Sequence, residues 1–174
     1  MPRFDPGNAE CFVLTYVKGA LSAVGHDLKL RVGTFRVDVN DEDRSIRATF
    51  DPASLRVENA MKRGQDAPGT LSEGDEKKIH RNVREDVLQP DRHPDIRFQS
   101  KSVENQNGVY RVTGDLTLHG QSRPISFDVR DEGERYETRI TLQQPDFGIE
   151  PYKAAFGGLK VKPEVDVLFR ASKG

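Results

Sequence analysis

Alternation of apolar and polar residues, the mark of a half-buried β-strand, runs along most of this chain. The alternating segments are residues 12–16, 28–32, 35–39, 46–50, 96–100, 110–118, 125–129, 136–142 and 165–169. Short polar stretches rich in turn-forming residues, such as Asn40–Asp43 and Asn105–Gly108, separate several of them. Consecutive strands joined by such turns pair antiparallel, so the pattern predicts a meander.

One segment departs from this period. Between Asp75 and Leu88 the apolar residues fall four apart, which is the spacing of an amphipathic helix. Ser72 together with Asp75 can cap the start of this helix, and Pro90 ends it. The preceding Lys62–Gly74 is rich in Gly, Asp, Pro and Ser and is predicted to be a mobile loop.

About eight strands with one apolar face each and no second helix leave two architectures, a β-barrel and a β-sandwich. The barrel is favoured because a continuous meander closes on itself and removes the exposed edges that invite aggregation. We therefore predict an all-β fold in a single domain over residues 1–174. It is expected to be an eight-stranded antiparallel β-barrel with one α-helix inserted between strands.

The residues alone leave the barrel interior open between two states, because a barrel of this size is either filled by side chains or holds one small ligand. Small side chains at Ala48, Ser100, Gly114 and Thr138 are expected to face inward and leave space at the centre. The alternative is that the inward aromatic residues pack against one another and fill it. The pattern does not decide between these states.

The composition narrows the classes of partner. Hydrophobic residues make up 34% of the chain and charged residues 32%, so apolar side chains are scarce and must follow a strict pattern to build a core. The formal net charge is -1, and basic residues are interleaved with acidic ones. This balance disfavours nucleic acid and anionic membrane surfaces, which need a clustered positive excess.

Cys11 is the only cysteine, which excludes an intramolecular disulfide framework and most zinc sites built on thiolates. The apolar stretch around it is divided by Lys18 into pieces too short for a signal peptide or a membrane span. Asp5 and Glu10 also disagree with the basic region of a signal peptide. We therefore expect a cytoplasmic protein with no integral membrane segment.

Candidate chemistry is sparse. The histidines His26, His80, His93 and His119 lack the spacing of a metal site, so no metal is predicted. Surface roles are expected for His80 and His93, and a hydrogen bond within its hairpin for His119. His26 interrupts the alternation near a barrel mouth, where an ordinary strand-end role is favoured over a contact with a ligand head group. Without a recognisable nucleophile, phosphate-binding loop or inward carboxylate pair, we predict no enzyme activity and no cofactor.

Several stretches resemble a known family. These are Asp91–Ser100, the hairpin Val112–Ile125, the Asp-Phe-Gly-Ile element Asp146–Ile149 and the closing strand at Val165–Val167. They are similar to the YceI-like family, small lipocalin-like barrels associated with polyisoprenoid and quinone binding. The resemblance covers roughly residues 33–169, whereas Ala23–Leu28 and Pro151–Lys162 depart from the family's pattern.

The resemblance implies a binding or carrier protein that sequesters an isoprenoid, a quinone or a similar amphiphilic lipid in the barrel. The residues expected to contact this hydrophobic small molecule are Phe12, Leu14, His26, Phe35, Phe50, Phe98, Tyr110, Leu116, Leu118, Phe127, Tyr136, Ile140, Phe147 and Phe169. The alternative function is a ligand-free barrel that acts as a protein-interaction or stress-response module, with Lys62–Gly74 as its contact surface.

Self-association is left open by the sequence. Val13, Val17 and Leu168, near the two ends of the chain, are expected to point outward. If they formed one apolar patch, that patch would support a homodimer. Scattered surface apolar residues are the alternative reading.

Overall fold

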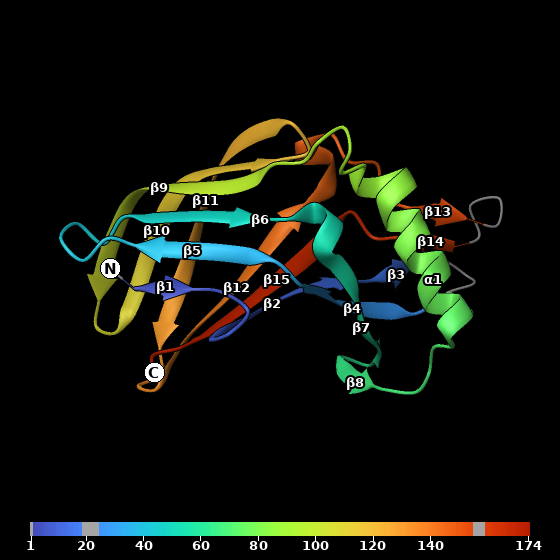
Figure 1. Ribbon diagram of the computed structural model, residues 1–174, viewed down its shortest axis with the longest axis horizontal. Coiled ribbons are helices and arrows are strands. Elements are labelled where there is room, and N and C mark those ends of the chain that lie inside the picture. The colour runs from blue at the N-terminus through green and yellow to red at the C-terminus, as the bar shows by residue number, and fades with distance from the viewer. Residues whose placement is uncertain (1, 19–24, 155–158) are drawn as a thin grey trace.

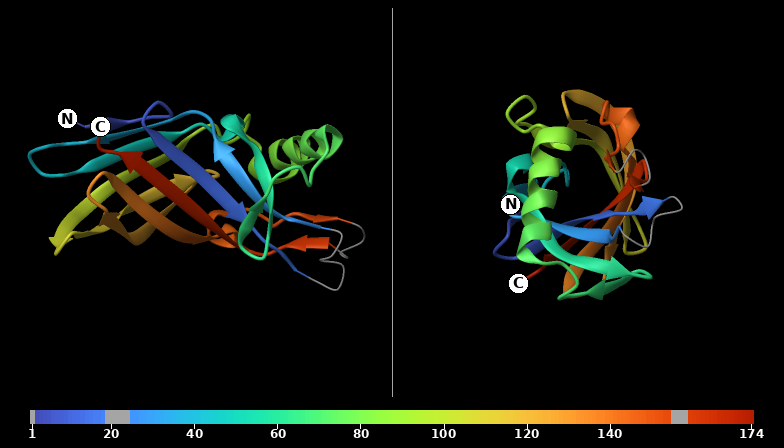
Figure 2. Two further views of the ribbon diagram at one scale, coloured as in Figure 1. Left: turned by 90° about the horizontal axis from the view of Figure 1, so that it is seen from below. Right: turned by 90° about the vertical axis from the view of Figure 1, so that its right-hand side faces the viewer.

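The computed structural model describes residues 2–18, 25–154 and 159–174. Most of these residues belong to antiparallel strands, which wrap around a common interior with one helical segment across one end (Figures 1 and 2). The strands of the larger sheet are β1 (Arg3–Phe4), β2 (Ala9–Thr15), β4 (Asp27–Val32), β5 (Phe35–Val39), β6 (Ile46–Phe50), β7 (Leu55–Lys62), β8 (Gln65–Ala67), β9 (Ile96–Gln106), β10 (Val109–Leu118), β11 (Gln121–Asp131), β12 (Arg135–Gln143) and β15 (Glu164–Ser172). The all-β antiparallel prediction with a single helical insertion is confirmed.

Neighbouring strands of this sheet follow the order β1-β5-β6-β9-β10-β11-β12-β15-β2-β4-β7-β8. The meander β9 to β12 and β15 therefore forms its centre, as the turn pattern predicted. One long hairpin supplies both flanks of the sheet. In the half next to its turn, β5 pairs with β6, and β6 pairs with β9. In the other half, β4 pairs with β7, and β4 pairs with β2.

The larger sheet has 12 strands, against the eight that we expected. The expected segments 28–32 and 35–39 are the successive strands β4 and β5, with a bend at Gly33 between them. Strand β7, which follows β6 after the 3-10 turn η1 (Pro52–Ser54), was not predicted from the pattern. The short strands β1 and β8 are additional. A separate three-stranded sheet contains β3 (Val17–Lys18), β13 (Lys153–Ala154) and β14 (Leu159–Val161).

The helical segment begins as predicted. In α1 (Glu73–Asn82), the Ser72 hydroxyl accepts a hydrogen bond from the Asp75 amide while the Asp75 carboxylate accepts one from the Ser72 amide. The segment continues as the π-helical η2 (Val83–Leu88), and Gln89 ends it in the left-handed conformation. Part of the predicted Lys62–Gly74 loop is instead ordered as β8, which pairs with β7.

The hairpin turns use residues that tolerate positive φ. Asn107 and Gly108 have φ of 56° and 87°, and His119 and Gly120 have φ of 54° and 74°. Two successive positive φ values fit the right-handed twist of the flanking strands. These turns fix the register of β9, β10 and β11.

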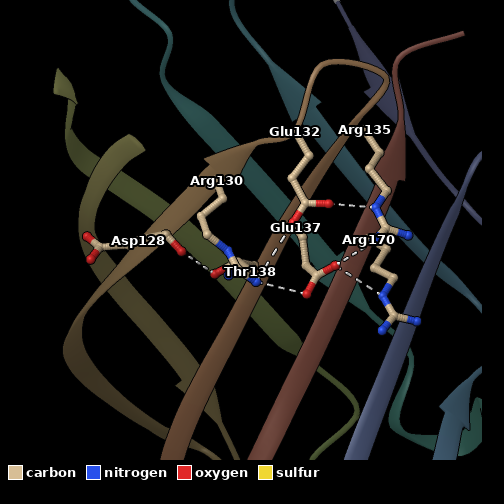
Figure 3. A network of polar contacts seen from close by, with 7 residues as sticks. All are labelled: Asp128, Arg130, Glu132, Arg135, Glu137, Thr138 and Arg170. Carbon is tan, nitrogen blue, oxygen red and sulfur yellow. Dashed lines mark hydrogen bonds and ion pairs between the residues drawn. The ribbon is translucent and has the colours of Figure 1, made fainter. Parts of the chain in front are cut away.

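The outer face of the sheet is charged. Glu137 on β12, whose side chain is 12% exposed, forms ion pairs with Arg130, Arg135 and Arg170 from the same and neighbouring strands (Figure 3). The next residue, Thr138, is buried, and its side chain lies on the opposite face because successive residues of a strand alternate between the two faces. This alternation separates a solvated exterior from an apolar interior, as the sequence pattern indicated.

Candidate functional site

A cavity of about 760 Å³ runs through the interior enclosed by the larger sheet, and we call it the lumen. Its walls come from strands on all sides, and α1 and η2 border one end. The volume lies in the range of binding sites for small organic molecules. Between the two states that the sequence left open, the structure therefore has an interior that its own side chains do not fill.

Most of the residues expected to contact a ligand line the lumen. These are His26, Phe50, Phe98, Tyr110, Leu116, Leu118, Phe127, Tyr136, Ile140, Phe147 and Phe169. Phe35 does not line it. Its ring instead packs behind those of Phe50 and Phe169, with ring centroids 6.0 and 5.8 Å away, so it supports the wall from within the core.

The predicted orientation of β2 was wrong. Phe12 and Leu14 do not line the lumen, although they are only 3% and 4% exposed. Phe12 lies on the outer face, where Lys29 Nζ and the Arg31 guanidinium sit 4.4 and 4.6 Å from its ring centroid. These cations shield the ring and attract its π face, so an aromatic residue can be buried outside the barrel.

Val13 and Val17 line the lumen instead, together with Cys11. The expectation that these valines point outward was therefore also wrong. Leu168 is on the outer face as expected, but it is buried, and it is paired across the strands with Phe12. The three residues proposed as a dimer patch thus do not form an exposed surface.

Burial dominates the chemistry of Cys11. The residue is 2% exposed, and desolvation raises the pKa of its thiol to about 12. A thiol is a weak nucleophile while it stays protonated. Cys11 therefore acts as a small apolar part of the lumen wall.

The two buried polar residues of the lumen wall have hydrogen-bond partners within the protein. The Thr138 hydroxyl donates to the Asp128 carbonyl at 2.7 Å, and the Gln144 side-chain amide donates to the Lys162 carbonyl at 3.1 Å. Gly114, predicted to leave space, is covered by the Phe98 ring, because a Cβ there would lie 2.6 Å from Phe98 Cζ. Away from its two ends, the wall is thus mainly apolar and well suited to hydrocarbon.

Aromatic rings line the end of the lumen nearest the β5–β6 hairpin. Tyr136 makes edge contacts with Phe4 and Tyr110, at centroid distances of 6.2 and 6.3 Å. The Arg44 guanidinium lies 5.8 Å from the Tyr110 centroid, and Lys173 Nζ lies 4.6 Å from that of Tyr136. We call this group the aromatic end.

The opposite end, the helix end, is covered by α1 and η2. No residue of either segment is buried. The Val57 amide in β7 donates a hydrogen bond to His80 Nε2 at 3.0 Å, which ties α1 to the sheet. A surface role was expected for His80, and the sequence does not indicate this hydrogen bond, because the partner is a backbone group distant in the chain.

The lumen surface near this end includes polar side chains. His26 lines it together with Asp75, Lys78 and Asn82 on the inner face of α1. Hydrogen bonding to the Ser72 amide lowers the pKa of Asp75, and the nearby His26 and Lys78 lower it further. The position of His26 at one end of the lumen agrees with the predicted mouth.

His93 and His119 lie against each other, with ring centroids 4.0 Å apart. Burial lowers the pKa of His119, and the charges of the neighbouring His93 and Arg92 lower it further. A hydrogen bond with the Phe147 backbone acts in the opposite direction. The bond joins the β10–β11 turn to η3 (Gln144–Phe147) rather than acting within the hairpin. His119 thus has a structural role behind the lumen wall.

Among residues 2–18, 25–154 and 159–174, no three histidine, cysteine or acidic side chains lie close enough to hold a metal ion. Within the same ranges, no helix is long and apolar enough to cross a membrane.

A sequence profile described as a YceI-like domain matches residues 4–172 of this chain. A UPF0312 protein of Pseudomonas putida strain F1 is 34% identical over 76 residues, which cover 37% of this chain and 40% of the relative. A second UPF0312 protein, from Photorhabdus laumondii, is 30% identical over 89 residues, which cover 51% of this chain and 41% of the relative. The matched stretch thus spans about two fifths of these relatives' length.

Solved structures share the fold at low identity. Burkholderia cenocepacia BcnA superposes with a TM-score of 0.64 and 16% identity, covering 93% of this chain and 94% of that one. A polyisoprenoid binding domain from Saccharophagus degradans superposes with a TM-score of 0.58 and 12% identity, covering 94% of each chain. At such identities the likeness shows the fold alone.

Proposed function

Because this chain belongs to the YceI-like family, we propose that it is a binding protein that holds an isoprenoid, a quinone or a similar amphiphilic lipid in its lumen. The observation that carries this proposal is the open lumen of about 760 Å³ with its apolar wall. The polyisoprenoid binding domain from Saccharophagus degradans, which has the same fold, supports the choice of ligand class.

The proposed mechanism is passive. Each methylene group moved from water into the lumen contributes up to about 0.8 kcal/mol, before the cost of ordering the ligand is subtracted. The wall residues Thr138 and Gln144 already have hydrogen-bond partners, so they make few demands on a hydrocarbon chain. Because the lining is mainly apolar and its buried polar groups are already hydrogen-bonded, we propose binding alone and no enzymatic step.

The proposal is tested by a substitution that reduces the free volume of the lumen. Ile140 lines the lumen from β12, so Ile140→Trp places a bulky ring in the space that a ligand would occupy. We expect the affinity for geranylgeraniol to fall by about a hundredfold, or about 2.8 kcal/mol, measured by displacement of a fluorescent lipid. The control is Arg97→Trp, which adds the same ring at an exposed position of β9.

Equal affinities of the two variants would contradict a lumen site, provided that both unfold at the temperature of the wild type. Mass spectrometry of lipids extracted from the purified protein offers a second measurement. Repeated recovery of no prenyl or quinone species would favour the protein-interaction alternative. The contact surface proposed for that alternative is residues 62–74, of which residues 65–67 form a strand paired with β7. Capture of a partner protein that is lost when residues 62–74 are deleted would support the alternative.

The domain organisation and the location of the protein are also proposals. The chain is proposed to act as one domain, in line with a profile match that runs from residue 4 to residue 172. A cytoplasmic location remains a prediction from the N-terminal residues.

A further inference from the structure

A second cavity, of about 520 Å³, lies on the outer side of the helix end. The segment 80–85 forms one side of it, and residues 52–56 of η1 and β7 form the other. We call it the arginine recess, because Arg56, Arg81 and Arg84 all line it.

These arginines differ from those on the strand faces. Arg31 and Arg139, for example, are ion-paired with Glu58 and Asp166. Arg56, Arg81 and Arg84 form no ion pair or side-chain hydrogen bond with any other residue that the structure describes. Glu85 is the one carboxylate in the lining, so three positive charges against one negative charge leave an excess of two.

Local geometry directs Arg56 into the recess. One terminal nitrogen of its guanidinium lies 3.1 Å from the position that a Cβ of Gly33 would take, so the absence of a side chain at Gly33 makes room for it. His80 adds a further donor. Its Nε2 accepts from the Val57 amide, so the neutral imidazole carries its proton on Nδ1.

The recess adjoins the lumen. Pro52, Leu55 and Val83 line both cavities, so the two are separated by a wall one residue thick. This wall runs along the seam between η1–β7 and the helical segment, in which no residue of α1 or η2 is buried. A chain that lies in the lumen can therefore emerge at this seam if the helical segment moves outward.

We propose that the arginine recess binds the phosphate group of an amphiphile whose hydrocarbon chain occupies the lumen. Guanidinium groups pair with phosphate oxygens through two parallel hydrogen bonds, and a phosphate supplies the negative charge that the recess lacks. The inference rests on the proposed function and narrows it, because it selects prenyl phosphates over quinones, which carry no compensating charge.

The cations at the other end of the lumen are already engaged. The Arg44 guanidinium lies over Tyr110, and Lys173 lies over Tyr136 and pairs with Asp131. The Arg123 guanidinium, in β11, donates a hydrogen bond to the Asp146 carbonyl. The recess therefore brings together three arginines that have no ion-pair or side-chain hydrogen-bond partner among the described residues, and only the charge of Glu58 acts on Arg56 from outside the lining.

The experiment compares two ligands that differ only in the head group, geranylgeranyl phosphate and geranylgeraniol. We expect the wild-type protein to bind the phosphate at least about tenfold more tightly, a difference of about 1.4 kcal/mol. Replacing Arg56, Arg81 and Arg84 together by Gln should abolish this preference and leave the affinity for geranylgeraniol within about twofold. Raising the salt concentration should also weaken the preference of the wild-type protein for the phosphate, because salt screens the attraction between the arginines and the phosphate.

The control replaces Arg47, Arg63 and Arg97, which lie elsewhere on the surface, by Gln and should keep the preference. Equal binding of both ligands by the wild type would overturn the recess proposal and leave the lumen function standing. Binding of neither ligand would count against the lumen function itself. Inorganic pyrophosphate provides a separate arm: if it binds in an arginine-dependent way while the two amphiphiles bind equally, the recess is a site for free phosphate and the head-group assignment fails.

Discussion

The two ends of the lumen are built in different ways. At the aromatic end, Phe4, Tyr110 and Tyr136 project from strands whose backbones are hydrogen-bonded to their neighbours, and their rings contact one another. At the helix end, the cover has no buried residue, and His80 ties it to the sheet. Opening the first end requires disruption of the sheet, whereas opening the second requires only separation of a helix from it. The helix end is therefore the expected entrance.

The largest expected effect comes from the aromatic end. Phe4→Ala removes a buried ring that contacts Tyr136 and should lower the free energy of unfolding by about 3 kcal/mol, measured by urea denaturation. Ile79→Ala in α1, which is only partly buried, should cost less than about 1 kcal/mol. Equal losses would remove the distinction between a fixed end and a loosely held one.

An intermediate effect on the free energy of unfolding is expected at alkaline pH from Cys11, which lies in the lumen wall between the two ends. Burial raises the pKa of Cys11 from 9.0 to about 12, so the folded chain holds this proton more tightly than the unfolded chain does. The resulting stability is complete below about pH 9 and is lost as the pH rises towards 12. The free energy of unfolding should fall between neutral pH and about pH 10.5 by roughly 2 kcal/mol more in the wild type than in Cys11→Ala.

This measurement also tests whether the wall opens locally. The comparison with Cys11→Ala cancels the titration of Tyr16 and the lysines, which is common to both proteins. Parallel pH profiles for the two proteins would mean that the thiol ionises without unfolding. Cys11 would then be reachable from solvent in the folded state, contrary to its burial.

The smallest effect on stability is expected at the helix end. His80→Ala removes the acceptor of the Val57 amide and should lower the free energy of unfolding by about 1 kcal/mol or less. Hydrogen exchange in α1 should nevertheless become faster, and a bound lipid should dissociate faster. Lys77→Ala, an exposed substitution on the same helix, is the control. Unchanged exchange in α1 would show that His80 does not hold the cover in place.

The sequence predicted the meander well because its local signals agree. In β9 to β12, apolar residues alternate with charged ones, and residues that tolerate positive φ, such as Asn107 and Gly108, stand at the turns. A single hydrophobic face leaves one orientation for each strand. The helix was equally readable, since Ser72 and Asp75 form the expected capping interactions.

In β2 the same reasoning failed, because both faces of the strand are apolar. Phe12 and Leu14 alternate with Cys11 and Val13, and the period cannot say which set is inside. The choice depends on Lys29 and Arg31 of β4, whose side chains cover the Phe12 ring. Which residue of β4 lies beside Phe12 is set by strand register, and the sequence of β2 alone does not contain that information.

The sequence by itself determined the strand period, the turns, the helix cap and the charged exterior, because each of these depends on residues close together in the chain. Only the tertiary structure decided that the lumen stays open, which end is loosely covered, and that Arg56 meets Arg81 and Arg84 in one recess. Those features depend on contacts between residues far apart in the chain, whose distances follow from sheet curvature and register. The difference between the two ends is of this second kind: aromatic rings contact one another at one end, and a helix held by His80 covers the other.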